Sequence, residues 1–323
     1  MHKLLLANFM FCCLIFTKCS YYGDKLPIST GADSKGAATS NTVACGCSWS
    51  ASTLPSSAQW NSIAFGNGVF AAVSLSSNSA ATSTDGTNWS SRTMPSVANW
   101  YSVIHGNGLF VAVSAGTVGA SSPDGITWTS RVLPSSSTWQ SVAFGNGTYA
   151  AVALSTNAAA SSTDGTTWTA RTMPSTTNWV SVTFGNGVFV AVSQNTNIAA
   201  TSPDGITWTQ RTLPSVDGWS SIAFGNNVFV AIANNTLNAA TSSDGINWTS
   251  RTMPSNTQWR TVTFGNGTFV AIANSSTTAA TSSDGINWTA QIMPSAAGWQ
   301  SAGYGNGVFV TVANGSNSAA TSP

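Results

Sequence analysis

The chain has 323 residues, of which only 6% are charged, and its formal net charge at pH 7 is +1. Typical domains carry about 25% charged residues, and this chain contains no glutamate at all. Such a composition offers no basic field for nucleic acid and no acidic field for cations. We therefore expect no nucleic-acid partner, and solubility must depend on Ser, Thr and Asn side chains.

The N-terminus is typical of a secretory signal. His2 and Lys3 precede an apolar run, residues 4–17, which is too short to span a membrane. We predict a signal peptide over residues 1–19. The protein is therefore expected to be secreted or held at the cell envelope or outer surface.

Cys19 follows the apolar run and resembles the acylated cysteine of bacterial lipoproteins. Lipoprotein signals place a small residue just before that cysteine, whereas this chain has Lys18. Lipidation at Cys19 and free secretion both stay open, and a lipid there would be the one membrane attachment we expect. Residues 20–44 are polar and rich in Ser, Gly and Thr, which is typical of a flexible linker.

The sequence from residue 60 onward is repetitive. A Gly-Asn-Gly signature, written once as Gly-Asn-Asn, recurs at intervals of 40 or, in one case, 39 residues. A fixed period in this range indicates stacked supersecondary units. The copies of the signature begin at Gly66, Gly106, Gly145, Gly185, Gly225, Gly265 and Gly305.

One repeat, residues 179–218, predicts four antiparallel strands, which we call A, B, C and D. Asn186-Gly187 between A and B is a strong hairpin signal, because both central residues of a type I′ turn need positive φ. Asp204-Gly205 is the second hairpin signal, and Pro214 is expected to end strand D. No window has apolar residues at helical spacing, so we expect an all-β fold. The predicted strands are residues 180–184, 188–193, 198–202 and 207–212.

The two ends of the chain complement each other. The last repeat stops at Pro323, before its strand D, and residues 46–56 match the strand D of residues 205–215. A ring in which this N-terminal strand completes the last sheet leaves no exposed edge. We predict a seven-bladed β-propeller over residues 45–323, with four-stranded blades of about 40 residues, closed by an N-terminal outer strand.

A Ser/Thr-x-Asp-Gly-x-x-Trp element recurs before strand D. It resembles the Asp-box, or bacterial neuraminidase repeat, of propellers in sialidases, other glycosidases and assembly factors, although the usual box has one more residue between Asp and Gly. The resemblance implies a β-propeller and no particular activity, because the box is a turn device away from the sialidase active centre. Physically, we expect the Asp to cap its own turn and the Trp to pack inside the blade. The pairs are Asp85 and Trp89, Asp124 and Trp128, Asp164 and Trp168, Asp204 and Trp208, Asp244 and Trp248, and Asp284 and Trp288.

An arginine follows this Asp by seven residues in most repeats, and Gln291 replaces it once. We predict that each Asp and Arg form a pair that braces the turn against strand D. The functional alternative is an arginine cluster for a sialic acid carboxylate, but that needs three arginines at one point, and ring symmetry spreads them apart. The arginines are Arg92, Arg131, Arg171, Arg211 and Arg251.

Few ionisable residues remain outside the repeat positions. In the predicted propeller these are His105, Asp217 and Arg260. Glycoside hydrolysis normally needs two carboxylates, and one His at a position usually occupied by Phe makes no triad, so we predict no enzyme and no cofactor. Cys45 and Cys47 are too close for an ordinary disulfide and lack further ligands, so we predict no metal site.

The A–B and C–D turns hardly vary and should lie on one face of the ring, whereas the variable D–A and B–C connections should lie on the other. A Trp opens every repeat beside these variable connections, and an aromatic plane next to small polar side chains suits a sugar. The alternative is that these indoles are buried between blades. The predicted ligand-binding residues are Trp60, Trp100, Trp139, Trp179, Trp219, Trp259 and Trp299.

The sequence therefore favours an exported, non-catalytic propeller that binds glycans or a cell-surface partner protein through its variable face. A glycosidase, sialidase or lyase on the same scaffold is the enzymatic alternative. A purely structural surface or assembly module is the third. Converging acidic residues at the ring centre would favour the enzyme, and exposed Trp would favour the glycan binder.

Overall fold

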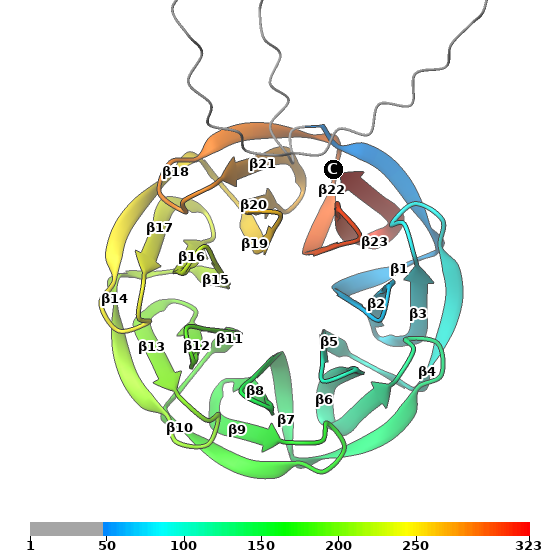
Figure 1. Ribbon diagram of the computed structural model, residues 1–323, viewed down its shortest axis with the longest axis horizontal. Coiled ribbons are helices and arrows are strands. Elements are labelled where there is room, and N and C mark those ends of the chain that lie inside the picture. Colours follow the sequence, from blue (N-terminus) through cyan, green and yellow to red (C-terminus); the bar gives the residue numbers. More distant parts are fainter. Residues whose placement is uncertain (1–47) are drawn as a thin grey trace, which may run out of the picture. The chain divides into compact units, whose positions relative to one another are not determined.

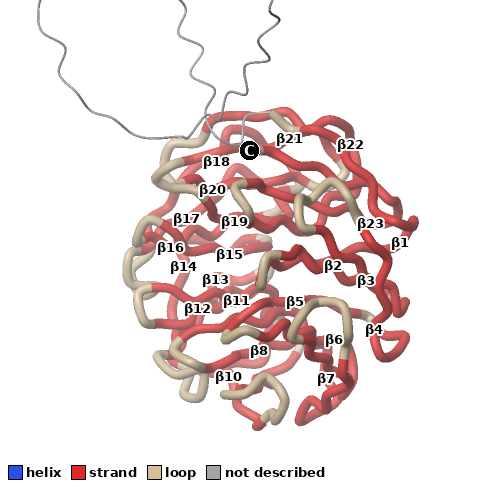
Figure 2. Tube along the Cα trace, turned by 45° about the vertical axis from the view of Figure 1, so that its right-hand side comes forward, coloured by secondary structure: helices blue, strands red, loops and turns tan. Residues whose placement is uncertain are grey.

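The computed structural model describes residues 48–323, which form antiparallel sheets arranged around a central opening (Figure 1). This part consists of strands and short connections (Figure 2). No helix among these residues is long and apolar enough to cross a membrane. The signal peptide and linker predicted over residues 1–44, together with Cys19, Cys45 and Cys47, lie outside the described residues.

A single repeat forms a four-stranded sheet. β11 (Trp179–Gly185), β12 (Val188–Ser193), β13 (Thr196–Ser202) and β14 (Thr209–Asp217) pair antiparallel in that order. β11 lies next to the central opening and β14 at the outer rim (Figure 1). The order recurs in β15 (Trp219–Gly225), β16 (Val228–Ala233), β17 (Thr236–Ser242) and β18 (Thr249–Thr257), which confirms the predicted four-stranded unit.

Other strands continue from one sheet into the next. β1 (Ser50–Gly66), β7 (Thr129–Gly145) and β22 (Thr289–Gly305) each pair first as an outer strand and then as an inner strand. β6 (Leu109–Ser122) and β23 (Val308–Ser322) each combine a second and a third strand. The remaining strands are β2 (Val69–Leu75), β3 (Ser77–Ser83), β4 (Ser90–Ala98), β5 (Trp100–Gly106), β8 (Thr148–Leu154), β9 (Thr156–Ser162), β10 (Thr169–Thr177), β19 (Trp259–Gly265), β20 (Thr268–Ala273) and β21 (Ser276–Ser282).

The N-terminal strand completes the last sheet, as the matching ends predict. The first residues of β1 pair antiparallel with the end of β23, with Ser50 opposite Thr321 and Ser52 opposite Ala319. The side chain of Leu54 is 1% exposed, so this strand also contributes to the core. The ring therefore closes through residues that are far apart in sequence, and no sheet edge is left open at that point.

The Gly-Asn-Gly signature forms the predicted type I′ turn. Asn186 and Gly187 have φ values of 46° and 77°, and Asn226 and Asn227 have φ values of 45° and 60°. The first glycine of the signature is required for a different reason, which is the space available beside it. A Cβ built on Gly185 would lie 2.0 Å from the Cγ of Phe224 in the next repeat, so only glycine lets that ring pack against the strand end.

Two predictions about strand D are wrong. Pro214 does not end the strand, because β14 continues to Asp217. The pairing register with β13 shifts between Thr196 and Ile198, and this irregularity accommodates a residue that has no N–H to donate. The turn before β14 is also longer than a two-residue hairpin turn, since β13 ends at Ser202 and β14 begins at Thr209.

The core lies within and between the sheets. The aromatic residue of each second strand is buried, as Phe189 and Phe229 show, and it packs against the aromatic residue of the inner strand. The ring centroids of Phe184 and Phe189 are 4.8 Å apart. Edge-to-face and tilted contacts at this distance are the arrangements that aromatic rings prefer. Each sheet thus buries apolar side chains on both faces, which holds its inner strand at a fixed place beside the central opening.

Candidate functional site

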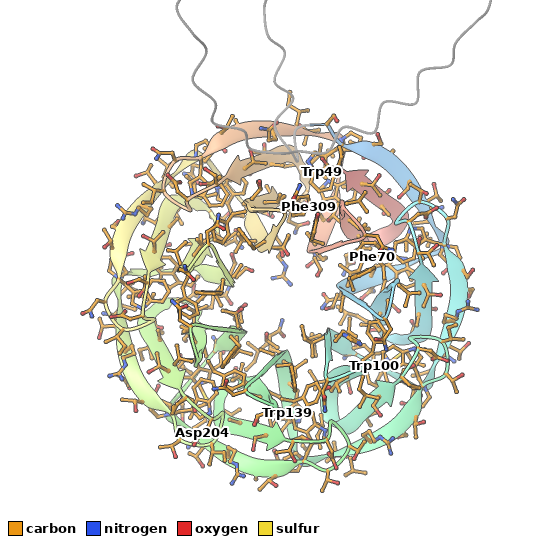
Figure 3. The ribbon with its side chains drawn as sticks, in the orientation of Figure 1. Trp49, Phe70, Trp100, Trp139, Asp204 and Phe309 are labelled. Atoms are coloured by element: carbon orange, nitrogen blue, oxygen red, sulfur yellow. The ribbon has the colours of Figure 1, made fainter. Side chains whose placement is uncertain are left out.

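The Trp residues that open the inner strands do not form a ligand platform. Each of these side chains is 0% exposed, so no indole face is available to a sugar. The indole N–H is satisfied inside the fold, since Trp179 Nε1 donates to the Ser175 carbonyl at 3.1 Å. Trp100 and Trp139 lie within the ring wall and away from the central opening (Figure 3). The prediction that Trp60, Trp100, Trp139, Trp179, Trp219, Trp259 and Trp299 bind a ligand is wrong.

The Asp residues cap their own turns, as predicted. Asp204 Oδ1 accepts hydrogen bonds from Ile206 N at 2.8 Å, Thr207 N at 3.1 Å and Ser202 Oγ at 3.0 Å. The backbone N–H of Ile206 is the main reason that the pKa of this carboxyl lies below its ordinary value. Four of the box Trp residues donate their indole N–H to the carbonyl of the glycine in the same turn, as Trp248 does to Gly245 at 3.1 Å.

Within residues 48–323 the predicted pairs of Asp and Arg are not formed. Arg211 Nε donates instead to the hydroxyl of Thr201 on the neighbouring strand, at 3.0 Å. Gln291, which stands at the equivalent position, donates from Nε2 to Thr281 Oγ1 at 3.1 Å. A neutral amide can replace arginine here because the bond goes to a neutral hydroxyl. These arginines lie along the outer strands. They therefore do not converge on one point and do not form a cluster that could bind a carboxylate.

A cavity of about 530 Å³ opens at the ring centre, on the face that carries the variable connections. It is lined by the residues that directly follow the buried Trp, by the next residues along the inner strands, and by residues at the ends of the second strands. The pairing of β11 with β12 shifts register between Trp179 and Ser181, so Val180 lies at a β-bulge, and Val180 and Ser181 both line the cavity. The variable face therefore does carry a site, but its lining is offset by one residue from the predicted Trp.

The cavity lining is uneven, although the repeats are nearly identical. Its apolar members all precede Ser181 in sequence and are Leu75, Tyr101, Leu154 and Val180. From Ser181 onward every lining residue is polar, namely Ser181, Gln194, Ser220, Ser221, Asn234, Arg260, Thr261, Asn274, Gln300, Ser301 and Asn314. Three further polar residues, Asn61, Ser62 and Gln140, come from the first part of the chain. One side of the cavity is thus partly apolar, and the other is rich in amides and hydroxyls.

Hydroxyl groups of the lining tie neighbouring sheets together. Ser62 Oγ accepts from Val103 N at 3.0 Å, Ser181 Oγ from Ile222 N at 3.2 Å, and Ser221 Oγ from Val262 N at 3.1 Å. A hydroxyl can donate as well as accept. The wall is therefore held in place by bonds between sheets and can still offer hydrogen-bond donors to a ligand.

Among the described residues, Arg260 is the one charged member of the cavity lining. Its Nε donates to Gln300 Oε1, from the neighbouring repeat, at 2.6 Å. Desolvation by burial lowers the pKa of the guanidinium from its ordinary value, but arginine stays protonated at physiological pH. Asn234 Oδ1, another lining side-chain atom, is buried and has no hydrogen-bond partner among the described residues.

The other unpaired candidates from the sequence lie elsewhere. His105 packs against Phe110, with ring centroids 4.7 Å apart, and burial lowers its pKa, which is consistent with the predicted core substitution. Asp217 accepts from Gly218 N at 2.8 Å and from Asn238 Nδ2 at 2.5 Å. His105, Asp217 and Arg260 are therefore not brought together. Over residues 48–323 there is no group of three His, Cys, Asp or Glu side chains that could hold a metal ion.

Comparison with known proteins identifies the architecture. Residues 171–300 match the family model described as the DUF6242 beta propeller domain. No curated protein matches the sequence.

Solved structures share the fold at low sequence identity. A streptogramin B lyase structure is 12% identical and has a TM-score of 0.76, covering 85% of this chain and 98% of its own. The virginiamycin B lyase from Staphylococcus aureus is 12% identical, with a TM-score of 0.75 and coverage of 85% and 98%. YCF48 bound to D1 peptide is 15% identical, with a TM-score of 0.69 and coverage of 88% and 99%. The chain is a β-propeller built from sequence repeats.

Proposed function

We propose that the protein is a non-catalytic β-propeller that binds an extended segment of a partner protein in its central cavity. The observation that carries this proposal is the uneven lining of the cavity. Repeats that are otherwise nearly identical place apolar residues on one side and amides, hydroxyls and one guanidinium on the other. A scaffold role alone requires no such difference between repeats.

The proposal includes a ring of seven blades over residues 45–323. The repeated Gly-Asn-Gly signatures support this number, and so do the long strands. If β1, β7 and β22 are each divided into an outer and an inner strand, and β6 and β23 into a second and a third strand, every signature falls in a unit of four strands. The strand supplied by β1 then completes the last blade.

A peptide segment fits this lining better than a glycan does. Sugar sites usually present aromatic faces, and the indoles that could have served are fully buried. Tyr101 is the one aromatic residue among the described residues of the lining. Asn and Gln side chains can both donate to peptide carbonyls and accept from peptide N–H groups, while Leu75, Leu154 and Val180 can contact an apolar side chain. YCF48, a propeller of similar fold, has been solved with a D1 peptide bound.

The enzymatic alternative lacks a carboxyl or imidazole group among the described residues of this site. None of the described lining residues is Asp, Glu or His, which are the side chains that most often act in general acid–base catalysis. The similarity to lyase structures is at 12% identity, so it concerns the fold. We therefore favour binding without chemistry.

Export belongs to the same proposal. It is supported by the apolar run of residues 4–17 after His2 and Lys3, and Cys19 would carry the lipid if the protein is anchored. A peptide-binding ring outside the cytoplasm would meet its partner at the cell envelope or outer surface.

Blocking the cavity tests the proposal. Gln194→Trp places a large side chain in the lining, and Ala170→Trp places the same side chain on the exposed outer strand β10 as a matched control. Immobilised wild-type protein should retain members of a random hexapeptide library. Ala170→Trp should retain the same peptides, and Gln194→Trp should lose them at unchanged melting temperature. Equal retention by Gln194→Trp would contradict the proposal, and so would binding of a glycan array without any peptide.

A further inference from the structure

Arg260 breaks the pattern of its own strand position. The residue after the buried Trp is Asn61, Tyr101, Gln140, Val180, Ser220 or Gln300 in the other repeats, and every one of these is neutral. The other arginines of the described part, Arg92, Arg131, Arg171, Arg211 and Arg251, donate to hydroxyls on neighbouring strands at the outer rim. The cavity therefore carries one cation in a chain with very few charges.

The guanidinium is held in a defined orientation. Its Nε donates to Gln300 Oε1 at 2.6 Å, and a guanidinium is planar, so this bond restrains the plane of the whole group. With Nε engaged, the two Nη groups form the edge that remains for a second partner. Two parallel N–H donors on such an edge match the two oxygens of a carboxylate.

The surroundings of Arg260 favour a ligand that has a negatively charged group and also hydrogen-bond donors. Over residues 48–323 no lining residue carries a carboxylate, so none of these residues neutralises the guanidinium. Burial already acts against its charged form, as the lowered pKa shows. A second observation is independent of the arginine: Asn234 Oδ1 is buried in the lining without a partner and is free to accept from a ligand N–H.

We propose that Arg260 binds a carboxylate of the ligand, with Gln300 as its positioning residue. This rests on the proposed function and adds the ligand class: a peptide segment that presents an acidic group to Arg260 and an apolar side chain toward Leu75, Tyr101, Leu154 and Val180. The carboxylate belongs either to an Asp or Glu side chain or to the C-terminus of the segment. Asn234, Asn274 and Asn314 are placed to pair with the peptide groups between these two ends.

Four hexapeptide libraries test the ligand class on the immobilised full-length protein. The first has free C-termini and all residue types, the second is amidated at the C-terminus, the third omits Asp and Glu, and the fourth is both amidated and free of Asp and Glu. Wild-type protein should retain the fourth library at least about tenfold more weakly than the first, because a charge-assisted bidentate pair is lost. Retention of the third library identifies the C-terminal carboxylate as the source, and retention of the second identifies a side chain.

Arg260→Gln is the matched variant, since Gln already occupies this position as Gln140 and Gln300. It should keep the melting temperature and lose the preference for the first library over the fourth. Arg260→Lys keeps the charge without the fork geometry and should give an intermediate preference. The inference is overturned if wild type retains all four libraries equally, or if Arg260→Gln keeps the preference, while Gln194→Trp still abolishes retention. If no library is retained, or if Gln194→Trp retains peptides as wild type does, the proposed function itself fails.

Discussion

The two faces of this ring are built from the same repeats and differ in how much they vary. On the face that carries the A–B and C–D turns, which we call the turn face, equivalent side chains make the same hydrogen bonds in successive repeats. Asn67 Nδ2 donates to the carbonyls of Gly108 and Pro123 in the next repeat, and Asn226 Nδ2 does the same to Gly267 and Ser283. In the cavity on the other face, equivalent positions hold Arg260, Val180 or Tyr101. A side chain that completes a bond between repeats is fixed by that bond, whereas one that points into an open cavity is free to specialise.

Ring closure should give the largest effect of any change, because it is shared by all repeats. Deletion of residues 45–56 removes the strand that pairs with β23, together with the buried side chains of Trp49 and Leu54. Burial of one large apolar side chain contributes about 1.5–3 kcal/mol, so the loss should exceed about 5 kcal/mol when the strand pairing is included. Urea unfolding should show a much lower midpoint, and light scattering should show aggregation through the open edge. A truncated protein that melts like the full-length chain would refute closure by this strand.

The buried indoles give the next largest effect, and they separate scaffold from site directly. Trp179→Ala should reduce the free energy of unfolding by about 3–5 kcal/mol, because a fully buried Trp leaves a cavity. Val180→Ala, one residue further on, should change stability far less and affect retention of apolar peptides instead, because Val180 lines the cavity. Denaturant midpoints and peptide retention measured on both variants check this. Similar stability losses for both would mean that the cavity lining is also scaffold.

On the turn face, loss of a single capping side chain should reduce stability by a smaller amount. Asp204→Ala removes the acceptor for Ile206 N, Thr207 N and Ser202 Oγ, and should cost about 1 kcal/mol of stability. Asp204→Asn keeps one acceptor oxygen and should recover part of this loss. Thermal unfolding of the two variants measures the difference. Peptide retention should be unchanged in both, and a selective loss of retention would move Asp204 from scaffold to site.

His105 allows a comparison by pH. Burial lowers its pKa in the folded state, so the unfolded chain binds the proton more readily. Stability should therefore be fully present above the unfolded value of about 6.5 and should decline as the pH falls below it. His105→Phe restores the aromatic residue of the other repeats and should abolish the decline between pH 7 and pH 5. The chain has one other histidine, His2, which is in the predicted signal peptide. An equal decline in the variant would exclude His105 as its source.

The sequence predicted the fold better than the site, and strand geometry explains why. The 40-residue period, the Asn-Gly turns and the match of residues 46–56 to strand D are sequence signals, and the structure confirms the four-stranded unit, the Asn-Gly turns and the pairing of β1 with β23, although not the predicted bounds of strand D. The side of a strand that faces the ring centre is not a local signal. Trp179 and Val180 are adjacent, but at the β-bulge between Trp179 and Ser181 the indole is buried, whereas Val180 and Ser181 line the cavity. The residue after each Trp varies between repeats and includes Arg260. This variation was the sequence signal that could have identified that position, instead of the Trp, as the cavity lining.

The smallest effect on stability is expected when arginine is replaced by glutamine, either at the outer rim or in the cavity. Arg211→Gln at the outer rim should change the free energy of unfolding by less than about 0.5 kcal/mol. The reason is on the same ring: Gln291 occupies the equivalent position and donates to Thr281 Oγ1, just as Arg211 donates to Thr201 Oγ1. Arg260→Gln should also leave stability nearly unchanged, but it should remove the preference for carboxylate-bearing peptides. Chemical unfolding and library retention, measured on both variants, therefore test whether charge matters at the rim or in the cavity. A loss of carboxylate preference in Arg211→Gln, with none in Arg260→Gln, would place recognition on the outer strands and would contradict the assignment of the cavity as the binding site.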